Sequence, residues 1–218
     1  MAAEPRYREG VRAIAPIAAM AVLFGASFGV LARAAGFDAV AAVVMSATTF
    51  AGSAQFAAVS ILGAGGSVAA AIAAAALLNA RYAPIGISVA SLFRGGFLRR
   101  AAEAQLVVDE SWAIASTGPG RFDRGRLIGA GAVLYAVWVT GTVAGVAAGS
   151  ALGDPKRYGL DAAFPALFLA LLVPQLRSRR AVAATIAGGG IALALLPFTP
   201  PGTPIVAATA ASLIGLRR

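Results

Sequence analysis

Polar residues interrupt one of the longest apolar runs of this sequence, in the stretch TFAGSAQF at residues 49–56. An unpaired polar group in hydrocarbon is strongly unfavourable, so Ser53 and Gln55 are expected to face protein, water or a ligand. Gly52 allows the helix to break here, and a broken helix offers backbone amides and carbonyls to a ligand. The sequence leaves two interpretations open: a packing face between helices, or a broken helix beside a binding site.

A second polar group lies in the apolar run at 67–93, in the stretch LLNARYAPIG. It contains Asn79 and Arg81, and an arginine inside a membrane segment is by default a candidate functional residue. The guanidinium could bind a carboxylate through two hydrogen bonds, and Pro84 should kink the helix because it lacks a backbone N–H. The alternatives are a structural ion pair or an arginine whose side chain reaches out to the membrane surface.

Two adjacent acids, Asp109 and Glu110, lie in the partly apolar stretch VVDESWA. Carboxyl groups in such a setting could carry a coupled proton across a membrane. The alternative is a helix cap, or the solvated face of a helix that lies along the membrane interface.

The composition of the whole chain is that of an integral membrane protein. Of its 218 residues, 59% are hydrophobic and 12% are charged, and the mean hydropathy is +0.82. A soluble domain carries about 25% charged residues. The apolar runs reach about 20 residues, the length that crosses about 30 Å of hydrocarbon. The alternating segments of a membrane β-barrel are absent, so an all-α polytopic helical bundle is expected.

The apolar runs predict about seven segments within one integral membrane domain that covers residues 1–218. These segments lie at 13–33, 38–62, 67–93, 127–150, 160–176, 181–198 and 203–216. The last two are short for membrane spans, and the Pro-rich stretch PFTPPGTP between them indicates a tight turn. The polar connector at 94–126 contains AEAQLVVDESWAIAS, which is suited to an amphipathic helix along the interface.

Basic residues in short loops predict the orientation. The connector at 94–126, the RSRR gap at 177–180 and the basic C-terminus can all lie in the cytoplasm. Three crossings before residue 94 would place the N-terminus outside, although it carries three arginines in its first twelve residues. Either the N-terminus is outside despite this bias, or one early segment is re-entrant, and the sequence leaves both open.

A short motif recurs, as GFDA at 36–39 and GLDA at 159–162, each time after a helix with spaced glycines. Three-helix units at 13–93 and 127–198, with one extra helix, would be inverted relative to each other, as in many secondary transporters. The alternative is that each Asp is an ordinary helix N-cap.

The sequence contains no Cys and no His. Disulfides and thiolate sites are therefore excluded, and so are the most common general base and metal ligand. The net charge of +9 comes from arginines clustered between apolar runs, as in membrane topology signals, so nucleic-acid binding is not expected. We expect no metal, no cofactor and no enzymatic activity.

Taken in order, the Gly-rich first helix, Ser-Ala-Gln-Phe, Asn-x-Arg and Asp-Glu resemble the AzlC family, the large subunit of bacterial branched-chain amino acid exporters. The resemblance is close over about residues 20–116 and looser beyond, where PALFLALL at 165–172 is similar. It implies proton-coupled export of Leu, Ile, Val, and Met or analogues, from the bacterial inner membrane, with a small AzlD-type membrane subunit. Many members have His after Asn-x-Arg, where this chain has Tyr82, so proton transfer would fall to Asp109 or Glu110.

An amino acid zwitterion needs a cation or helix N-terminus for its carboxylate, acceptors for its ammonium group and an apolar pocket for its side chain. Arg81 could meet the first need, and Ser53 and Gln55 with freed carbonyls the second. The expected substrate-binding residues are Phe50, Ser53, Gln55, Phe56, Asn79 and Arg81, with helix breaks at Gly52 and Pro84 and proton coupling by Asp109 and Glu110. The alternatives are a transporter or channel for another small organic solute, and a non-transporting scaffold or regulatory subunit.

Overall fold

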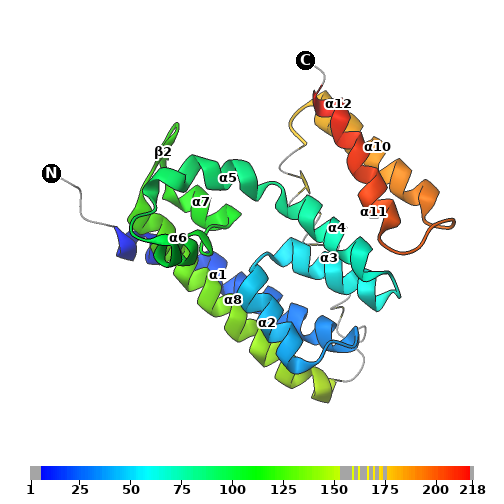
Figure 1. The fold of residues 1–218 in the computed structure, drawn as a ribbon, viewed down its shortest axis with the longest axis horizontal. Coiled ribbons are helices and arrows are strands. Elements are labelled where there is room, and N and C mark those ends of the chain that lie inside the picture. The colour runs from blue at the N-terminus through cyan, green and yellow to red at the C-terminus, as the bar shows by residue number, and fades with distance from the viewer. Residues whose placement is uncertain are drawn as a thin grey trace.

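The computed structural model describes residues 6–152 and 176–216, and between them Gly159, Ala162, Ala166, Leu169, Leu172 and Val173. Apart from a small antiparallel hairpin of β1 (Ser116–Gly118) and β2 (Arg121–Phe122), the regular structure of the described residues is helical. This confirms the all-α membrane fold class, and Figure 1 shows the arrangement.

Two long helices, α1 (Tyr7–Ala34) and α8 (Arg124–Leu152), form a closely packed pair. Both are long and apolar enough to cross a membrane. Glycines bring their backbones together, since an added Cβ on Gly25 would lie 2.5 Å from the carbonyl oxygen of Trp138. Gly10 faces Arg126 and Gly29 faces Thr142, so the two helices run side by side in the same direction (Figure 1).

The next two helices, α2 (Ala39–Thr49) and α3 (Gly52–Gly63), form a re-entrant hairpin. Asp38 caps α2 at the end of α1, and α2 then runs back along α8 to Phe50, whose ring meets Tyr135. From there α3 returns, and Gly63 packs against Ala35, where the hairpin began. Each arm is about 17 Å long at 1.5 Å per residue, roughly half of the hydrocarbon core. The segment predicted at 38–62 therefore enters and leaves at the same end of the α1–α8 pair.

A bent pair, α4 (Val68–Asn79) and α5 (Tyr82–Val89), is the next candidate for a crossing. With the 3₁₀ turn Ala90–Leu92 it is long and apolar enough to span, and it bends by 43°. The break lies at Ala80 and Arg81, one turn before Pro84, where a proline at this position removes the backbone hydrogen bond. Pro84 cannot donate a hydrogen bond to the carbonyl of Ala80, and it occupies the first turn of α5, where no donor is required.

The connector after this crossing contains α6 (Phe97–Ala104), α7 (Asp109–Ala115) and the β-hairpin. The sequence predicted one amphipathic helix over residues 102–116. The structure instead divides this stretch between α6 and α7. Val108 is extended, and the Ser111 hydroxyl accepts its N–H at 3.0 Å and donates to the carbonyl of Leu106 at 2.8 Å, which fixes a sharp turn. The turn reaches the end of α2, where the Gln105 amide donates to the carbonyl of Thr48 at 2.9 Å.

The C-terminal elements form a helical hairpin of α10 (Arg179–Leu195), α11 (Thr203–Ala208), a 3₁₀ turn (Thr209–Ser212) and α12 (Leu213–Leu216). The predicted turn between the arms is present, and an added Cβ on Gly202 in this turn would lie 2.9 Å from the Ala70 side chain and 3.0 Å from that of Ile61. Figure 1 shows α11 beside α4. Of the predicted repeat, most of 160–176 lies outside the described residues. Inverted units at 13–93 and 127–198 would begin with antiparallel helices, whereas α1 and α8 are parallel.

Candidate functional site

A cavity of about 150 Å³ lies where four parts of the structure meet. These are the turn between α2 and α3, the turn between α6 and α7, the α4–α5 break and the α1–α8 pair. An apolar cavity of this size holds a molecule such as benzene, so the site suits a small organic solute. Its wall from α1 and α8 is apolar, whereas α3, the break and α7 supply polar groups. The lining residues are Ile17, Met20, Ala21, Phe24, Phe50, Gly52, Ser53, Arg81, Tyr82, Val108, Asp109, Glu110, Leu134 and Trp138.

Arg81 is the centre of the polar part of this cavity. One of its terminal nitrogens, Nη2, lies 3.0 Å from Oδ2 of Asp109 and donates to the Ser53 hydroxyl at 3.0 Å. It also donates to the Tyr82 hydroxyl at 3.4 Å, and the guanidinium carbon lies 5.1 Å from the centroid of the Tyr82 ring. The Arg81 and Asp109 side chains are 34% and 35% exposed. The pair is therefore accessible from the cavity. Arg81 thus forms an ion pair with Asp109 and at the same time presents its guanidinium to a ligand in the cavity.

In TFAGSAQF the helix breaks between α2 and α3, at Phe50 and Ala51, one residue before Gly52. Phe50 has φ 38° and ψ 50°, a left-handed conformation that costs a non-glycine residue about 1–2 kcal/mol. Gly52 then begins α3 beside the Trp138 ring, to which an added Cβ would come within 2.9 Å. Gly52 and Ser53 line the cavity at the N-terminus of α3, where the helix dipole favours negative charge.

Gln55 does not line the cavity, although the sequence predicted a substrate contact. Its side chain is fully buried, and Oε1 accepts the N–H of Ala51 at 3.2 Å and the indole N–H of Trp138 at 3.1 Å. Its Nε2 donates to the hydroxyl of Ser46 at 3.0 Å, and this hydroxyl in turn pairs with Thr142 at 2.7 Å. These contacts tie the break between α2 and α3 to α8, so Gln55 maintains the shape of the site.

Two other predicted contact residues also lie outside the cavity lining. Phe56 is 1% exposed and packs edge-on against Phe28 and Trp138 in the core. Asn79 ends α4, and its Oδ1 is buried without a hydrogen-bond partner in the described part of the chain. Of the predicted contact residues, the structure thus brings Phe50, Ser53 and Arg81 together in the cavity lining. The other three, Gln55, Phe56 and Asn79, lie outside this lining.

The two acids both line the cavity from the first turn of α7. Asp109 pairs with Arg81, while Glu110 forms no ion pair with any described residue. The site therefore holds one compensated and one uncompensated carboxyl group beside a single guanidinium.

Sequence reasoning missed the apolar wall and the contacts that position the turns. Met20 and Leu134 resemble any other residue in their apolar helices, so no local signal separates them. Trp138 carried a usable signal, because an indole N–H buried in a membrane helix needs an acceptor. So did Gln105, whose amide donates to the carbonyl of Ala47 at 3.3 Å as well as to that of Thr48.

The family described as AzlC protein matches residues 16–152, more than half of the chain. This chain belongs to the AzlC family. The matched range contains every element that lines the cavity: α1, the α2–α3 hairpin, the α4–α5 break, α7 and α8.

Three relatives place the chain among membrane proteins of this family. An Archaeoglobus fulgidus protein named as an uncharacterized membrane protein is 36% identical, with 95% of this chain and 93% of the relative covered. The branched-chain amino acid transport protein AzlC of Bacillus subtilis is 28% identical, with coverage of 83% and 72%. The inner membrane protein YgaZ of Escherichia coli is also 28% identical, with coverage of 89% and 83%. No solved structure shows significant similarity.

Proposed function

We propose that this AzlC-family protein exports branched-chain amino acids, namely Leu, Ile and Val, and Met or analogues, across the bacterial inner membrane. The export is coupled to protons and uses a small AzlD-type membrane subunit. Family membership and the name of the Bacillus subtilis relative support the substrate class. The structural observation that carries the proposal is a cavity with an accessible ion pair beside an apolar wall.

This cavity has the chemical groups that an aliphatic amino acid requires. The carboxylate binds to Arg81, next to Ser53 at the N-terminus of α3, which adds the partial charge of the helix dipole. The aliphatic side chain packs on the wall from α1 and α8, where Met20 and Leu134 present apolar surface. Because the lining is largely apolar, a hydrophilic side chain would lose its hydration without replacement.

Proton coupling is assigned to the carboxyl groups of α7. Glu110 faces the cavity and forms no ion pair with a described residue, so it can take up and release a proton without breaking one. Asp109 can do so only when Arg81 has another anionic partner. Tyr82, which stands where many relatives have His, accepts a hydrogen bond from Arg81 through its hydroxyl but remains neutral near pH 7.

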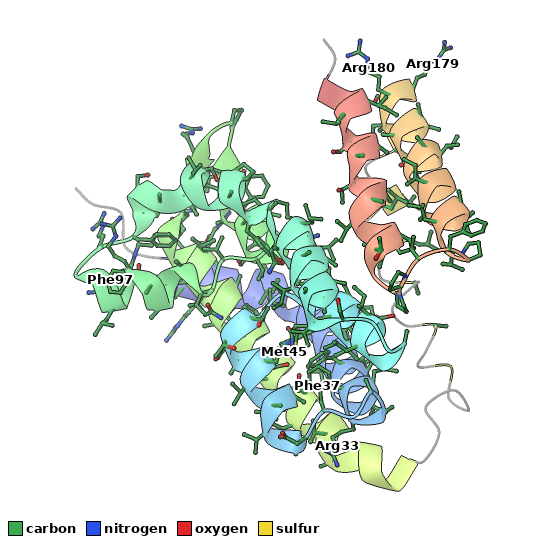
Figure 2. The ribbon with its side chains drawn as sticks, turned by 45° about the vertical axis from the view of Figure 1, so that its right-hand side comes forward. Arg33, Phe37, Met45, Phe97, Arg179 and Arg180 are labelled. Atoms are coloured by element: carbon green, nitrogen blue, oxygen red, sulfur yellow. The ribbon has the colours of Figure 1, made fainter. Side chains whose placement is uncertain are left out.

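Both termini are assigned to the cytoplasm. The start of α1 contacts the start of α8 through an ion pair between Glu9 and Arg126, with 2.7 Å between oxygen and nitrogen. This end therefore holds the N-terminal arginines and the connector 94–126 together. Arg179 and Arg180 lie at the far side of the molecule from Arg33 (Figure 2). With one re-entrant segment before residue 94, the basic regions share one side, as the distribution of positive charge requires.

The test is counterflow of labelled leucine into proteoliposomes that contain the purified protein and its small subunit. Arg81→Ala is expected to lower the rate at least about tenfold, because the substrate carboxylate loses the guanidinium that lines the cavity. Arg126→Ala, which removes an ion pair outside the cavity, is the matched control and should transport normally. If no aliphatic amino acid moves, with or without a pH gradient, the proposed function is wrong.

A further inference from the structure

The Arg81–Asp109 pair is the only ion pair among the described residues that lies in the cavity lining. Its two members come from different elements, since Arg81 lies at the α4–α5 break and Asp109 begins α7. Only one contact, from Nη2 to Oδ2 at 3.0 Å, joins them. The pair therefore closes the cavity between the bent span and the α6–α7 turn.

An unpaired charge is costly inside a membrane protein, and in the empty cavity Arg81 and Asp109 neutralise each other. A ligand that carried only a carboxylate would bind Arg81 and leave Asp109 without a partner. A ligand that carried only an ammonium group would leave Arg81 without one. An α-amino acid carries both charges, so its insertion replaces one ion pair by two and adds no net charge.

The guanidinium also has unused capacity to bind a carboxylate. The ion pair and the hydrogen bonds of Arg81 to described residues all use Nη2, so its other terminal nitrogen, Nη1, has no partner among them. A carboxylate that binds through two parallel hydrogen bonds satisfies more of the guanidinium than the single contact with Asp109 does. The substrate carboxylate can therefore compete with Asp109 for Arg81.

We propose that substrate binds by ion-pair exchange, in which its carboxylate replaces Asp109 on Arg81 and its ammonium group binds Asp109. This inference rests on the proposed function and assigns Asp109 as the residue that selects for the ammonium group. Exchange also breaks the link between α7 and the α4–α5 break, so binding loosens the α6–α7 turn from the bent span. Glu110 stays available for the coupled proton.

The experiment compares leucine with two analogues that each lack one charged group. These are 3-methylbutylamine, without the carboxylate, and 4-methylpentanoate, without the ammonium group. Each is used to compete with labelled leucine for purified protein in detergent with its small subunit. We expect wild-type protein to bind either analogue at least about tenfold more weakly than leucine, because each leaves one partner of the pair uncompensated.

Asp109→Asn should lower the affinity for leucine at least about tenfold and leave the affinity for 4-methylpentanoate equal or higher, so that the two ligands bind alike. Arg81→Gln should make 3-methylbutylamine bind as well as leucine does. Glu9→Gln, which breaks the ion pair to Arg126 outside the cavity, should leave all three affinities unchanged. If Asp109→Asn fails to fold, Arg81→Gln with Asp109→Asn removes both charges and should bind all three ligands with no charge preference.

Ion-pair exchange is overturned if Asp109→Asn binds leucine as tightly as wild-type protein does and keeps the same preference for leucine over 4-methylpentanoate. The proposed function would still stand after this result. Equal loss of all three ligands in Asp109→Asn, with folding intact by size-exclusion chromatography, also overturns it, because a merely structural role would affect them alike. Failure of wild-type protein to bind any aliphatic amino acid overturns the proposed function and this inference together.

Discussion

At the scale of single residues, the side-chain amide of Gln55 bonds to three groups. They are the N–H of Ala51, the indole N–H of Trp138 and the hydroxyl of Ser46. The two N–H groups would be unsatisfied in an apolar interior without this amide, whereas the Ser46 hydroxyl would still pair with Thr142. The bond to Ala51 helps to cap the start of α3. The sequence indicates that Gln55 must avoid lipid, but both a substrate contact and an internal bond satisfy that requirement.

Gln55→Ala is expected to destabilise the protein by about 2–4 kcal/mol, since it leaves buried donors unpaired and opens a small cavity. The measurement is the thermal unfolding temperature in detergent, compared with that of Ser27→Ala. Ser27 bonds only to a carbonyl of its own helix and is a matched control, expected to change stability by less than about 0.5 kcal/mol. Unchanged unfolding together with lost leucine binding would instead place Gln55 in contact with substrate.

At the scale of elements, two short hairpins approach each other inside a frame of longer helices. The α2–α3 turn and the turn between α6 and α7 meet where Gln105 donates to the last carbonyls of α2. The Tyr135 hydroxyl donates to the carbonyl of Ala47 at 3.0 Å, so α8 holds the same helix end. Irregular backbone at this depth is tolerated because protein side chains satisfy it beside a cavity.

The frame depends on the close contact between α1 and α8. An added Cβ on Gly145 would overlap the carbonyl of Ala26, and neither backbone can move away without separating the helices. Gly145→Val should therefore abolish a monodisperse product on purification. Gly189 lies within α10 with open space around it, and Gly189→Ala should leave the yield unchanged and stability equal or up to about 1 kcal/mol higher. A normal yield for Gly145→Val would contradict the tight helix contact.

The α6 helix is held to the start of α8 by Glu103, which bonds to Arg124 and Arg99. Burial acts to raise the pKa of Glu103, but hydrogen bonds from both arginines outweigh it and hold the pKa below its ordinary value. The stabilisation is therefore complete above about pH 4.5, the range of an unfolded Glu, and is lost as pH falls through the lower folded value.

The expected result is a fall in unfolding temperature as wild-type protein is acidified from pH 7 to pH 4, with a smaller fall in Glu103→Gln. The variant should already be less stable than wild type at pH 7, because it cannot form the charge-assisted bonds. Parallel curves for the two proteins would show that Glu103 does not contribute to this pH dependence.

At the scale of the whole molecule, the re-entrant α2–α3 hairpin sets the topology. Before the connector at 94–126, the described helices that are long and apolar enough to cross are α1 and the bent pair α4–α5. The N-terminus and this connector are then on the same side, which removes the conflict between the basic N-terminus and three early crossings.

The chain has no cysteine, so single-cysteine variants test this topology without background labelling. Ala64→Cys, in the exposed turn between α3 and α4, should react with a membrane-impermeant thiol reagent on intact cells. Arg8→Cys and Arg100→Cys should react only after permeabilisation. Labelling of Arg8→Cys and Arg100→Cys from opposite sides would mean that segment 38–62 crosses the membrane. If Ala64→Cys reacted only after permeabilisation while the other two variants reacted on intact cells, the proposed orientation would be wrong.

The sequence by itself determined the membrane class, the helical fold and the presence at TFAGSAQF of polar groups that must avoid lipid. These follow from composition and from polar residues within apolar windows, which depend only on residues near one another in the chain. The same reasoning selected Arg81, Ser53 and Asp109, because isolated polar groups in apolar segments need partners.

Only the tertiary structure decided which of these groups meet. Ser53, Arg81 and Asp109 come from three elements, and their contacts depend on how α3, the α4–α5 break and α7 fold back on the α1–α8 pair. Hydropathy also cannot separate a crossing from a re-entrant hairpin, because both bury a similar apolar length and differ only in the direction after Phe50. That direction is set by long-range packing of α3 along α1, which returns Gly63 to Ala35.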